Sequence, residues 1–446
     1  MTAESREAMS VTMRWVIVAA FLVAYVFSFI DRLIIGLMVE PLKRDLLLTD
    51  TEISLLQGLA FAAFYTLVGL PIGRIVDRHS RIAIAASGVA IWSAMTALCG
   101  LAQNYTQLFM ARVGVGVGEA TLSPAAYSLF ADLFERRQLG LALGIYNMGS
   151  AAGGGLAMIV GGLVVQFASG QSVVDVPLLG ELRSWQLTFI YVGLPGLLVA
   201  VWIWLLPEPT RRSSDGRAAQ AGAVPAAIPI REVLAFARQR RRSIAGHHLG
   251  VAFSNLSAFA IVSWMPVMLM RAYGWTIAEA GLATGIALII GGLLGLMGGG
   301  WLSDKRYLLE GTAGRIRLCM IVSVLGVPAA LFLGHVDEAI VALALFTVIY
   351  ICSIGPISPA VAALQEMVPA ELRGQMSAFY LFVVNIIGIT LGSTAVALLS
   401  DNIFTSPDGI RYSLSVVSPI ALVIAAFFYA WSMSSIRRDT ARAEAP

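Results

Sequence analysis

Long apolar runs separated by short polar segments dominate the pattern of this sequence. An α-helix needs about 20 mainly apolar residues to cross a hydrocarbon core of about 30 Å. Twelve runs are close to that length or exceed it, and the pattern therefore predicts an all-α membrane protein with twelve transmembrane helices. The runs lie near residues 15–39, 52–76, 82–102, 106–130, 139–168, 185–206, 244–270, 280–302, 318–334, 339–364, 375–400 and 412–435.

A polar stretch at residues 208–243 divides the runs into six and six. We therefore predict an N-terminal six-helix bundle (1–207), a cytoplasmic linker (208–243) and a C-terminal six-helix bundle (244–446). The linker contains the segment IREVLAFARQRRR. This segment suits either a basic amphipathic helix on the membrane surface or a solvated connection.

Lysine and arginine are distributed unevenly between the segments that join the runs. If the N-terminus lies inside, the inner segments hold 23 of these residues and the outer segments hold 5, while Arg32 and Arg112 lie within runs. Loops on the cytoplasmic side of membrane proteins are enriched in these residues. We therefore expect a multi-pass protein of the cell membrane with both termini in the cytoplasm. The expected membrane is a bacterial inner membrane. The first apolar run, of about 25 residues, is too long for a cleavable signal and is expected to be retained.

Composition agrees with this class and excludes others. The chain is 58% apolar and 13% charged, whereas soluble chains carry about 25% charged residues. Its three cysteines have neither disulfide nor zinc spacing, and the phosphate-binding and hydrolase motifs are absent from the sequence. We therefore predict no enzyme activity, no cofactor and no metal site. The basic residues are scattered through short loops, so no nucleic-acid partner is expected.

Two segments of the first half recur in the second. GRIVDRHSR (73–81) is echoed by GWLSDKR (300–306), and SPAAYSLFADLFERRQLGLALGIY (123–146) by SPAVAALQEMVPAELRGQMSAFY (358–380). Tyr146 and Tyr380 occupy matching positions in the second pair. Duplicated halves of transporters usually enclose a site near the bilayer midplane, so the repeat predicts a site between the bundles.

These motifs carry a family resemblance. G-x-x-x-D-R-x-x-R after the second run, with a weaker copy after the eighth, resembles the loop signature of the major facilitator superfamily, and RVGVGVGEA (112–120) resembles its span-four motif. The longer string from RVGVGVGEA through SPAAYSLFADLF, the glycine-rich segment YNMGSAAGGG and the pair Asp31-Arg32 are similar to Spinster-type lipid transporters. The resemblance implies the fold of that superfamily and a transport function.

Four charged residues lie well inside the runs: Asp31, Arg32, Arg112 and Glu119. Each costs about 2.5–3.5 kcal/mol at a helix centre, so a function is expected to retain them. A rise of 1.5 Å per residue puts Asp31 and Arg112 at nearly the same depth and Glu119 two turns deeper, on the same face as Arg112. Asp31 and Arg32 diverge by roughly 100°, so one can face a cavity while the other braces a neighbouring helix.

The resemblance implies that the first and fourth runs line the central cavity. We hypothesise that an arginine binds an anionic head group, with Arg112 as the first candidate and Arg32 as the second. Asp31 and Glu119 are expected to exchange protons. Competition between the substrate anion and a carboxylate for one arginine would couple proton and substrate. The alternative is a fixed salt-bridge cluster that ties the two helices together.

The C-terminal half has no Lys, Arg, Asp or Glu at 243–270 or 339–365. We expect one charged cavity wall and one apolar wall with a few polar groups, which suits an amphiphile, since burial of a tail gains about 0.8 kcal/mol per methylene. Alternatively, the apolar residues face lipid or other helices. Besides Arg32 and Arg112, the residues expected to bind substrate are Tyr146, Asn255, Trp264, Tyr350, Ser353 and Tyr380.

Charges in the repeated loops suggest a gate. The resemblance implies that Asp77, Arg78, Arg81 and Asp304 latch the two halves together when the protein opens outward. The ordinary enrichment of inner loops in basic residues explains the arginines equally well, but not the aspartates.

The sequence thus predicts a secondary active transporter of an anionic amphiphile, with proton coupling as the expected driving force. The resemblance implies that the amphiphile is a lysophospholipid or a sphingosine-phosphate-like lipid. The alternative is a proton-linked permease for small organic anions of the sugar-acid type. A lipid hydrolase and a non-transporting sensor are the weaker alternatives. The expected partners are the lipid-like anion, protons and membrane lipids, and the expected form is a monomer.

Overall fold

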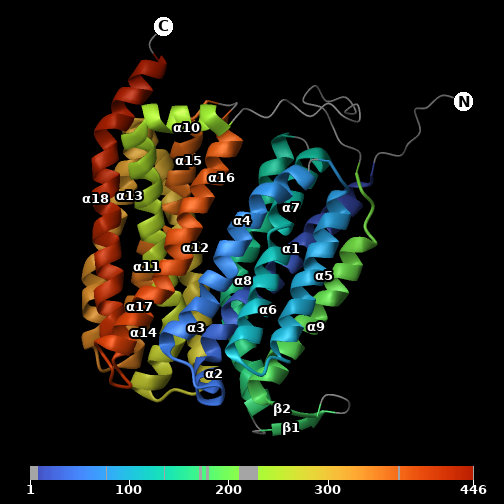
Figure 1. Ribbon diagram of the computed structural model, residues 1–446. Helices are drawn as coiled ribbons and strands as arrows, with labels where there is room; N and C mark the ends of the chain where they lie inside the picture. Colours follow the sequence, from blue (N-terminus) through green and yellow to red (C-terminus); the bar gives the residue numbers. More distant parts are fainter. Residues whose placement is uncertain are drawn as a thin grey trace, which may run out of the picture.

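The computed structural model describes residues 9–76, 78–134, 136–169, 173–176, 180–209, 230–369 and 372–444. Long helices account for nearly all of these residues. Figure 1 shows the helices in two groups that stand side by side, one coloured blue to green and the other yellow-green to red. We refer to α1–α9 as the N-terminal half and to α10–α18 as the C-terminal half.

The N-terminal half contains nine α-helices, one short 3₁₀ helix and two strands among the residues described. Several of its helices begin after a residue whose side chain accepts a hydrogen bond from a free backbone N–H of the first turn, as Ser10, Ser80 and Asn104 do. The elements are α1 Val11–Leu33, η1 Ile34–Leu37, α2 Val39–Leu46, α3 Asp50–Gln57, α4 Leu59–Val76, α5 Arg81–Cys99, α6 Tyr105–Glu119, α7 Leu122–Leu133, α8 Arg136–Ser169, β1 Val173–Val176, β2 Gly180–Arg183 and α9 Ser184–Trp204.

The C-terminal half repeats this plan without strands in its described part. Its helix α12 begins with a reciprocal pair of hydrogen bonds between Thr276 and Glu279. The elements are α10 Ile230–Gln239, α11 Arg241–Tyr273, α12 Ile277–Glu310, α13 Thr312–Phe332, η2 Leu333–His335, α14 Ala339–Ile354, α15 Ile357–Met367, α16 Arg373–Val384, the π-helix η4 Asn385–Leu391, α17 Gly392–Asn402 and α18 Ile410–Glu444.

The structure confirms an all-α membrane architecture, with two differences from the expected pattern. Eleven helical segments of the described chain are long and apolar enough to cross a membrane. The fourth expected span does not qualify because α6 ends at Glu119 and α7 starts at Leu122, and the Thr121 hydroxyl donates to the Gly118 carbonyl at 2.9 Å at the break. A small antiparallel hairpin, β1–β2, also joins α8 to α9.

The segment IREVLAFARQRRR forms a helix, α10, followed directly by the start of α11. Figure 1 shows α10 lying across the ends of the C-terminal helices. Val233 is buried in a cluster with Met367 and Val368, and Phe236 packs against the same cluster. The expected amphipathic helix is therefore present, and its apolar face is covered by the C-terminal half. Residues 210–229 of the predicted linker lie outside the described part of the chain.

The two halves meet closely along α8 and α12. A Cβ atom on Gly285 would lie 2.5 Å from the carbonyl oxygen of Gly155, and one on Gly281 would lie 2.6 Å from the carbonyl oxygen of Met158. Small residues allow membrane helices to approach this closely. The glycine-rich segment YNMGSAAGGG therefore brings part of α8 against the other half.

Ionic contacts between the halves gather at the end that carries α2 and α3, opposite α10 in Figure 1. Arg271 of α11 donates to Asp50 at 2.8 and 2.9 Å and to Glu40 at 2.6 Å. Asp401, at the end of α17, accepts from the backbone N–H groups of Asp50 and Thr51 at 3.2 and 2.7 Å, where the dipole of α3 favours a negative charge. These contacts hold the halves together at what we term the α2–α3 end.

Replacing Arg271 by Gln is expected to loosen the α2–α3 end, because Asp50 and Glu40 lose their partner in the other half. Spin labels can be attached at Leu47→Cys and Thr405→Cys, two exposed positions on opposite halves. The ratio of molecules with a long distance between the labels to molecules with a short one should rise about fivefold, which corresponds to a change of about 1 kcal/mol in the free energy of opening. The natural cysteines are buried. Arg44→Gln, which removes an exposed pair within α2, is the matched control and should leave the distances unchanged. Equal distances in the Arg271 variant and the wild type would contradict the assignment.

Candidate functional site

A buried ion pair joins α1 to the end of α6. Arg32 donates to one oxygen of Glu119, Oε2, from Nη2 at 2.5 Å and from Nε at 3.0 Å. The Ser28 hydroxyl, one turn earlier in α1, donates to the same oxygen at 2.6 Å. Glu119 is 2% exposed, and its other oxygen, Oε1, has no hydrogen-bond partner in the described structure. Charge-assisted bonds of this kind are the strong ones, so Arg32 and Glu119 stabilise each other within the apolar interior.

Aromatic rings surround the guanidinium of Arg32. Its Cζ lies 4.5 Å from the ring centre of Phe61, 4.9 Å from that of Phe29 and 5.2 Å from that of Tyr65. The faces of such rings attract cations. The rings therefore help to stabilise the positive charge of Arg32 even when Glu119 no longer pairs with it.

Arg112 and Asp31 form a second layer behind this pair. Arg112 is fully buried and donates from Nη1 to the main-chain oxygen of Asp31 at 2.9 Å. This contact confirms that the two residues lie at the same depth. In the described structure Nε and Nη2 of Arg112 and Oδ1 of Asp31 have no hydrogen-bond partner, and the charges of Arg112, Arg32 and Glu119 all act on Asp31. The four groups together are formally neutral.

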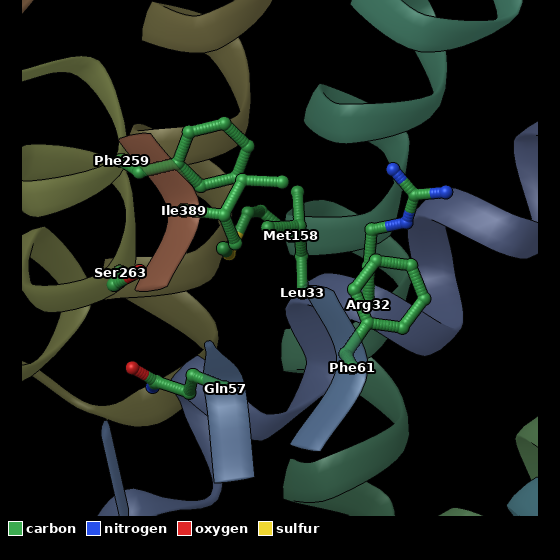
Figure 2. A pocket seen from close by; sticks show the side chains of 8 residues that line it. All are labelled: Arg32, Leu33, Gln57, Phe61, Met158, Phe259, Ser263 and Ile389. Atoms are coloured by element: carbon green, nitrogen blue, oxygen red, sulfur yellow. The ribbon is translucent and has the colours of Figure 1, made fainter. Parts of the chain in front are cut away.

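A cavity with a volume of about 20 Å³ lies beside Arg32 between the two halves. This volume is enough for about one water molecule. The N-terminal half contributes Arg32, Leu33, Gln57, Phe61 and Met158, and the C-terminal half contributes Phe259, Ser263 and Ile389. Figure 2 shows Arg32 and Phe61 on one side and Phe259, Ser263 and Ile389 on the other, with Leu33 and Met158 between them. Of Asp31 and Arg32, it is thus Arg32 that reaches the cavity, while Asp31 packs between helices.

Gln57 is a polar residue of the cavity that the sequence analysis missed. It is 9% exposed, and neither its amide oxygen nor its amide nitrogen has a hydrogen-bond partner in the described structure. A buried amide without partners is costly, so a ligand or water in the cavity is the natural partner. The signal was present in the sequence as an amide within the apolar run ISLLQGLA, but the sequence alone does not show which face of this helix meets the other half.

The other residues expected to bind substrate do not line this cavity in the conformation described. Tyr146 is buried and shares a hydrogen bond of 2.9 Å with Ser123, and the indole of Trp264 donates to the Ser393 carbonyl at 2.9 Å. Ser353 donates to the hydroxyl of Ser257 at 3.0 Å. The remaining three pack against neighbouring groups: Asn255 against Gly388, Tyr350 against Phe346, and Tyr380 against His247 and His248. Their role in binding stays a prediction.

The expected wall of apolar residues is also arranged differently. Apolar side chains come from both halves, Leu33, Phe61 and Met158 from one and Phe259 and Ile389 from the other. The amide, Gln57, belongs to the charged half rather than to the C-terminal one. The cavity is thus apolar around most of its surface, with its charge and its amide on the N-terminal side.

Two of the four loop residues expected to latch the halves, Arg81 and Asp304, have partners within their own halves here. Arg81 is fully buried, pairs with Asp132, and donates to Glu208 at 2.8 Å. Burial raises the pKa of Glu208, but hydrogen bonds from the Ile82 backbone, Arg81 and Ser80 outweigh burial and leave this pKa below its ordinary value.

In the C-terminal half, Asp304 accepts from Arg315 at 3.0 Å. Arg78 is exposed, and Asp77 lies outside the described residues. The latch remains a prediction for another conformation.

Two membrane-spanning helical halves that meet around a central cavity, with an arginine at the cavity wall, are typical of membrane transporters. Residues 21–393 match the model of the Major Facilitator Superfamily, and the chain belongs to this family. The family consists of transporters, not enzymes.

Several proteins of known type are similar to the chain. An MFS-type efflux pump of Mycolicibacterium smegmatis is 26% identical over 429 residues, which cover 95% of this chain and 94% of the pump. The probable L-galactonate transporter of Escherichia coli K12 is 26% identical over 313 residues, which cover 67% of this chain and 63% of that transporter.

Among solved structures, a bacterial homologue of the human lysosomal transporter Spinster, in an inward-facing and unoccupied conformation, is 26% identical with a TM-score of 0.83. The match covers 96% of this chain and 99% of the homologue. The chain is therefore a Spinster-like member of the family.

Proposed function

We propose that the protein is a proton-coupled secondary transporter of an anionic amphiphile, a lysophospholipid or a sphingosine-phosphate-like lipid. One observation carries this proposal: a paired arginine, Arg32, lies at the wall of a mostly apolar cavity between the halves. The arginine suits an anionic head group, and the apolar walls suit a hydrocarbon tail.

Arg32 is the group best placed to contact the substrate anion. Its side chain is 13% exposed and borders the cavity, whereas Arg112 is fully buried. We assign two roles to Arg112. In the conformation described its charge balances that of Asp31 behind the site, and in a more open conformation Arg112 would contact the substrate anion directly. The polar atoms of Gln57 and Ser263 on the cavity wall would form hydrogen bonds with hydroxyl groups of the same head group.

Glu119 provides a direct route from proton to substrate. Protonation of Glu119 would remove the charge that holds Arg32 and leave the guanidinium ready for an anion. In the reverse direction, an anion that takes over Arg32 leaves a buried carboxylate without its counter-charge, and this carboxylate would then take up a proton. The unpartnered Oε1 offers a position for that proton. Asp31, also buried with an unpartnered oxygen, is the second proton carrier in the proposal.

Alternating access would move the cavity from one side of the membrane to the other. With both termini in the cytoplasm of the cell, the closed α2–α3 end would face outward. The similar Spinster homologue has an inward-facing conformation. The bundles 1–207 and 244–446 would rock about the contact between α8 and α12. When the α2–α3 end opens, Asp77, Arg78, Arg81 and Asp304 would close the opposite end.

A permease for small organic anions of the sugar-acid type is the second candidate. Two observations favour it: the amide and hydroxyl groups of the cavity wall, and the similarity to an L-galactonate transporter. The two candidates share Arg32, Glu119 and the proton exchange. They differ only in whether the cavity accepts a tail.

The proton role is tested with Glu119→Gln and Asp31→Asn in proteoliposomes loaded with labelled lysophosphatidylglycerol or L-galactonate. A pH gradient should accelerate uptake by the wild type about tenfold over the rate without a gradient, and Glu119→Gln should abolish this acceleration while exchange of substrate for substrate continues. Glu181→Gln, at an exposed position of β2, is the control. Unchanged pH dependence in both variants would remove the proton role from these carboxylates.

The tail is tested by competition at the same binding site. Lysophosphatidylglycerol should inhibit uptake at concentrations at least about 100-fold lower than its tail-less head group, glycerophosphoglycerol, because burial of even four methylenes gains about 3 kcal/mol. Equal inhibition by the two compounds would contradict an amphiphile site and favour the organic-anion permease.

Gln57→Leu is expected to raise the KM for a hydroxylated substrate about tenfold, because the lost hydrogen bonds contribute about 0.5–1.5 kcal/mol each. The maximal rate should change little if the amide serves recognition alone. Gln138→Leu, at an exposed position of α8, controls for the loss of an amide. The assignment of Gln57 to substrate recognition would be wrong if both variants kept the KM of the wild type.

A further inference from the structure

A pocket lined by arginines lies away from the central cavity, where α10, α11 and α18 meet. Its volume is about 240 Å³, larger than a phosphate group. Four of the residues that line it are arginines, and none of the lining residues is acidic. They are Gln239, Arg240, Arg241, Arg242, Ser243, Ser435 and Arg438.

The local fold concentrates these charges at one point. The chain ends α10 at Gln239 and begins α11 at Arg241, so three consecutive arginines fall at the junction. Arg240 is held in place by a bond of 2.9 Å to the Met367 carbonyl and by stacking on Phe236, 5.0 Å from the ring centre. Arg438 enters from α18 and donates to Ser435 at 3.4 Å.

The positive charge of this pocket is uncompensated within the described part of the chain. Arg241 and Arg242 are exposed and have no hydrogen-bond or ion-pair partner there. Like charges gathered so closely repel one another. An anion that enters the pocket would therefore relieve repulsion as well as gain hydrogen bonds.

The pocket lies at the edge of the membrane-spanning region. The span formed by α11 starts at Arg241, and the span that belongs to α18 ends at Arg438. Lipid head groups occupy this level of a bilayer, and basic pockets between transmembrane helices are suited to phosphate-bearing head groups. Guanidinium groups match phosphate oxygens through paired hydrogen bonds.

We propose that the pocket between α10, α11 and α18 is a phosphate-binding site, and that the phosphate of an anionic membrane lipid occupies it. Arg241 and Arg242 bind the phosphate oxygens, and Arg240 and Arg438 supply the flanking charge. The bound lipid fixes the junction of α10 and α11 to the membrane surface. This site is separate from the substrate cavity and does not depend on the proposed transport function.

The test measures binding of fluorescent phosphatidylglycerol to the purified full-length protein in micelles that contain phosphatidylcholine. The double variant R241Q/R242Q should bind about 30-fold more weakly than the wild type. The double variant R231Q/R238Q removes the same charge from exposed positions of α10 that do not line the pocket, and its affinity should stay within about twofold of the wild type. Equal affinity in R241Q/R242Q and the wild type, or equal loss in both double variants, would overturn the proposal.

Two further arms separate the source of the phosphate and guard against misfolding. Competition by millimolar inorganic phosphate would identify a site that binds free phosphate, whereas the absence of competition would support the lipid head group. Should R241Q/R242Q not fold, R438Q, on a separate helix, is expected to bind about fivefold more weakly. Unchanged affinity in R438Q would then overturn the proposal.

Discussion

The ion pair between Arg32 and Glu119 is the interaction on which the rest of this structure depends. A single charge in the membrane interior costs several kcal/mol, and removal of one partner from a buried pair leaves the other uncompensated at a cost of about 3–5 kcal/mol. The pair therefore fixes the position of α1 against α6, and the aromatic rings and Ser28 complete its surroundings. Because Arg32 also borders the cavity, we propose that an anion that enters the cavity competes with Glu119 for the same guanidinium.

In the proposed mechanism, the arrangement of the halves makes that competition useful for transport. The halves would rotate about the backbone contact at the glycines of α8 and α12, and the contacts of Arg271, Asp50 and Asp401 hold them together at the α2–α3 end. A cavity of about 20 Å³ has no room for a substrate, so binding requires the halves to separate. Charge exchange at Arg32 and rotation of the halves are then linked, since an anion between the halves contacts both of them.

Sequence reasoning found the architecture and the charged cluster, because charges and apolar runs are properties of the chain itself. The similar depth of Asp31 and Arg112 followed from helix rise alone. The rotation of each helix about its axis does not follow from the sequence, because it depends on packing. The sequence therefore favours Arg112 over Arg32 as the anion-binding residue, although it is Arg32 that borders the cavity. For the same reason Trp264 and Ser353 were expected at the cavity but lie between helices, and Gln57, an uncharged residue, was overlooked.

Proton exchange on substrate binding tests the central claim most directly. Calorimetric titration of the purified protein with lysophosphatidylglycerol and with L-galactonate, in buffers of different ionisation enthalpy, counts the protons taken up per ligand bound. The account predicts proton uptake by the wild type with whichever compound is the substrate, and fewer protons taken up per ligand by the Glu119→Gln variant. Binding by the wild type without proton uptake would contradict the exchange of Glu119 for a substrate anion at Arg32.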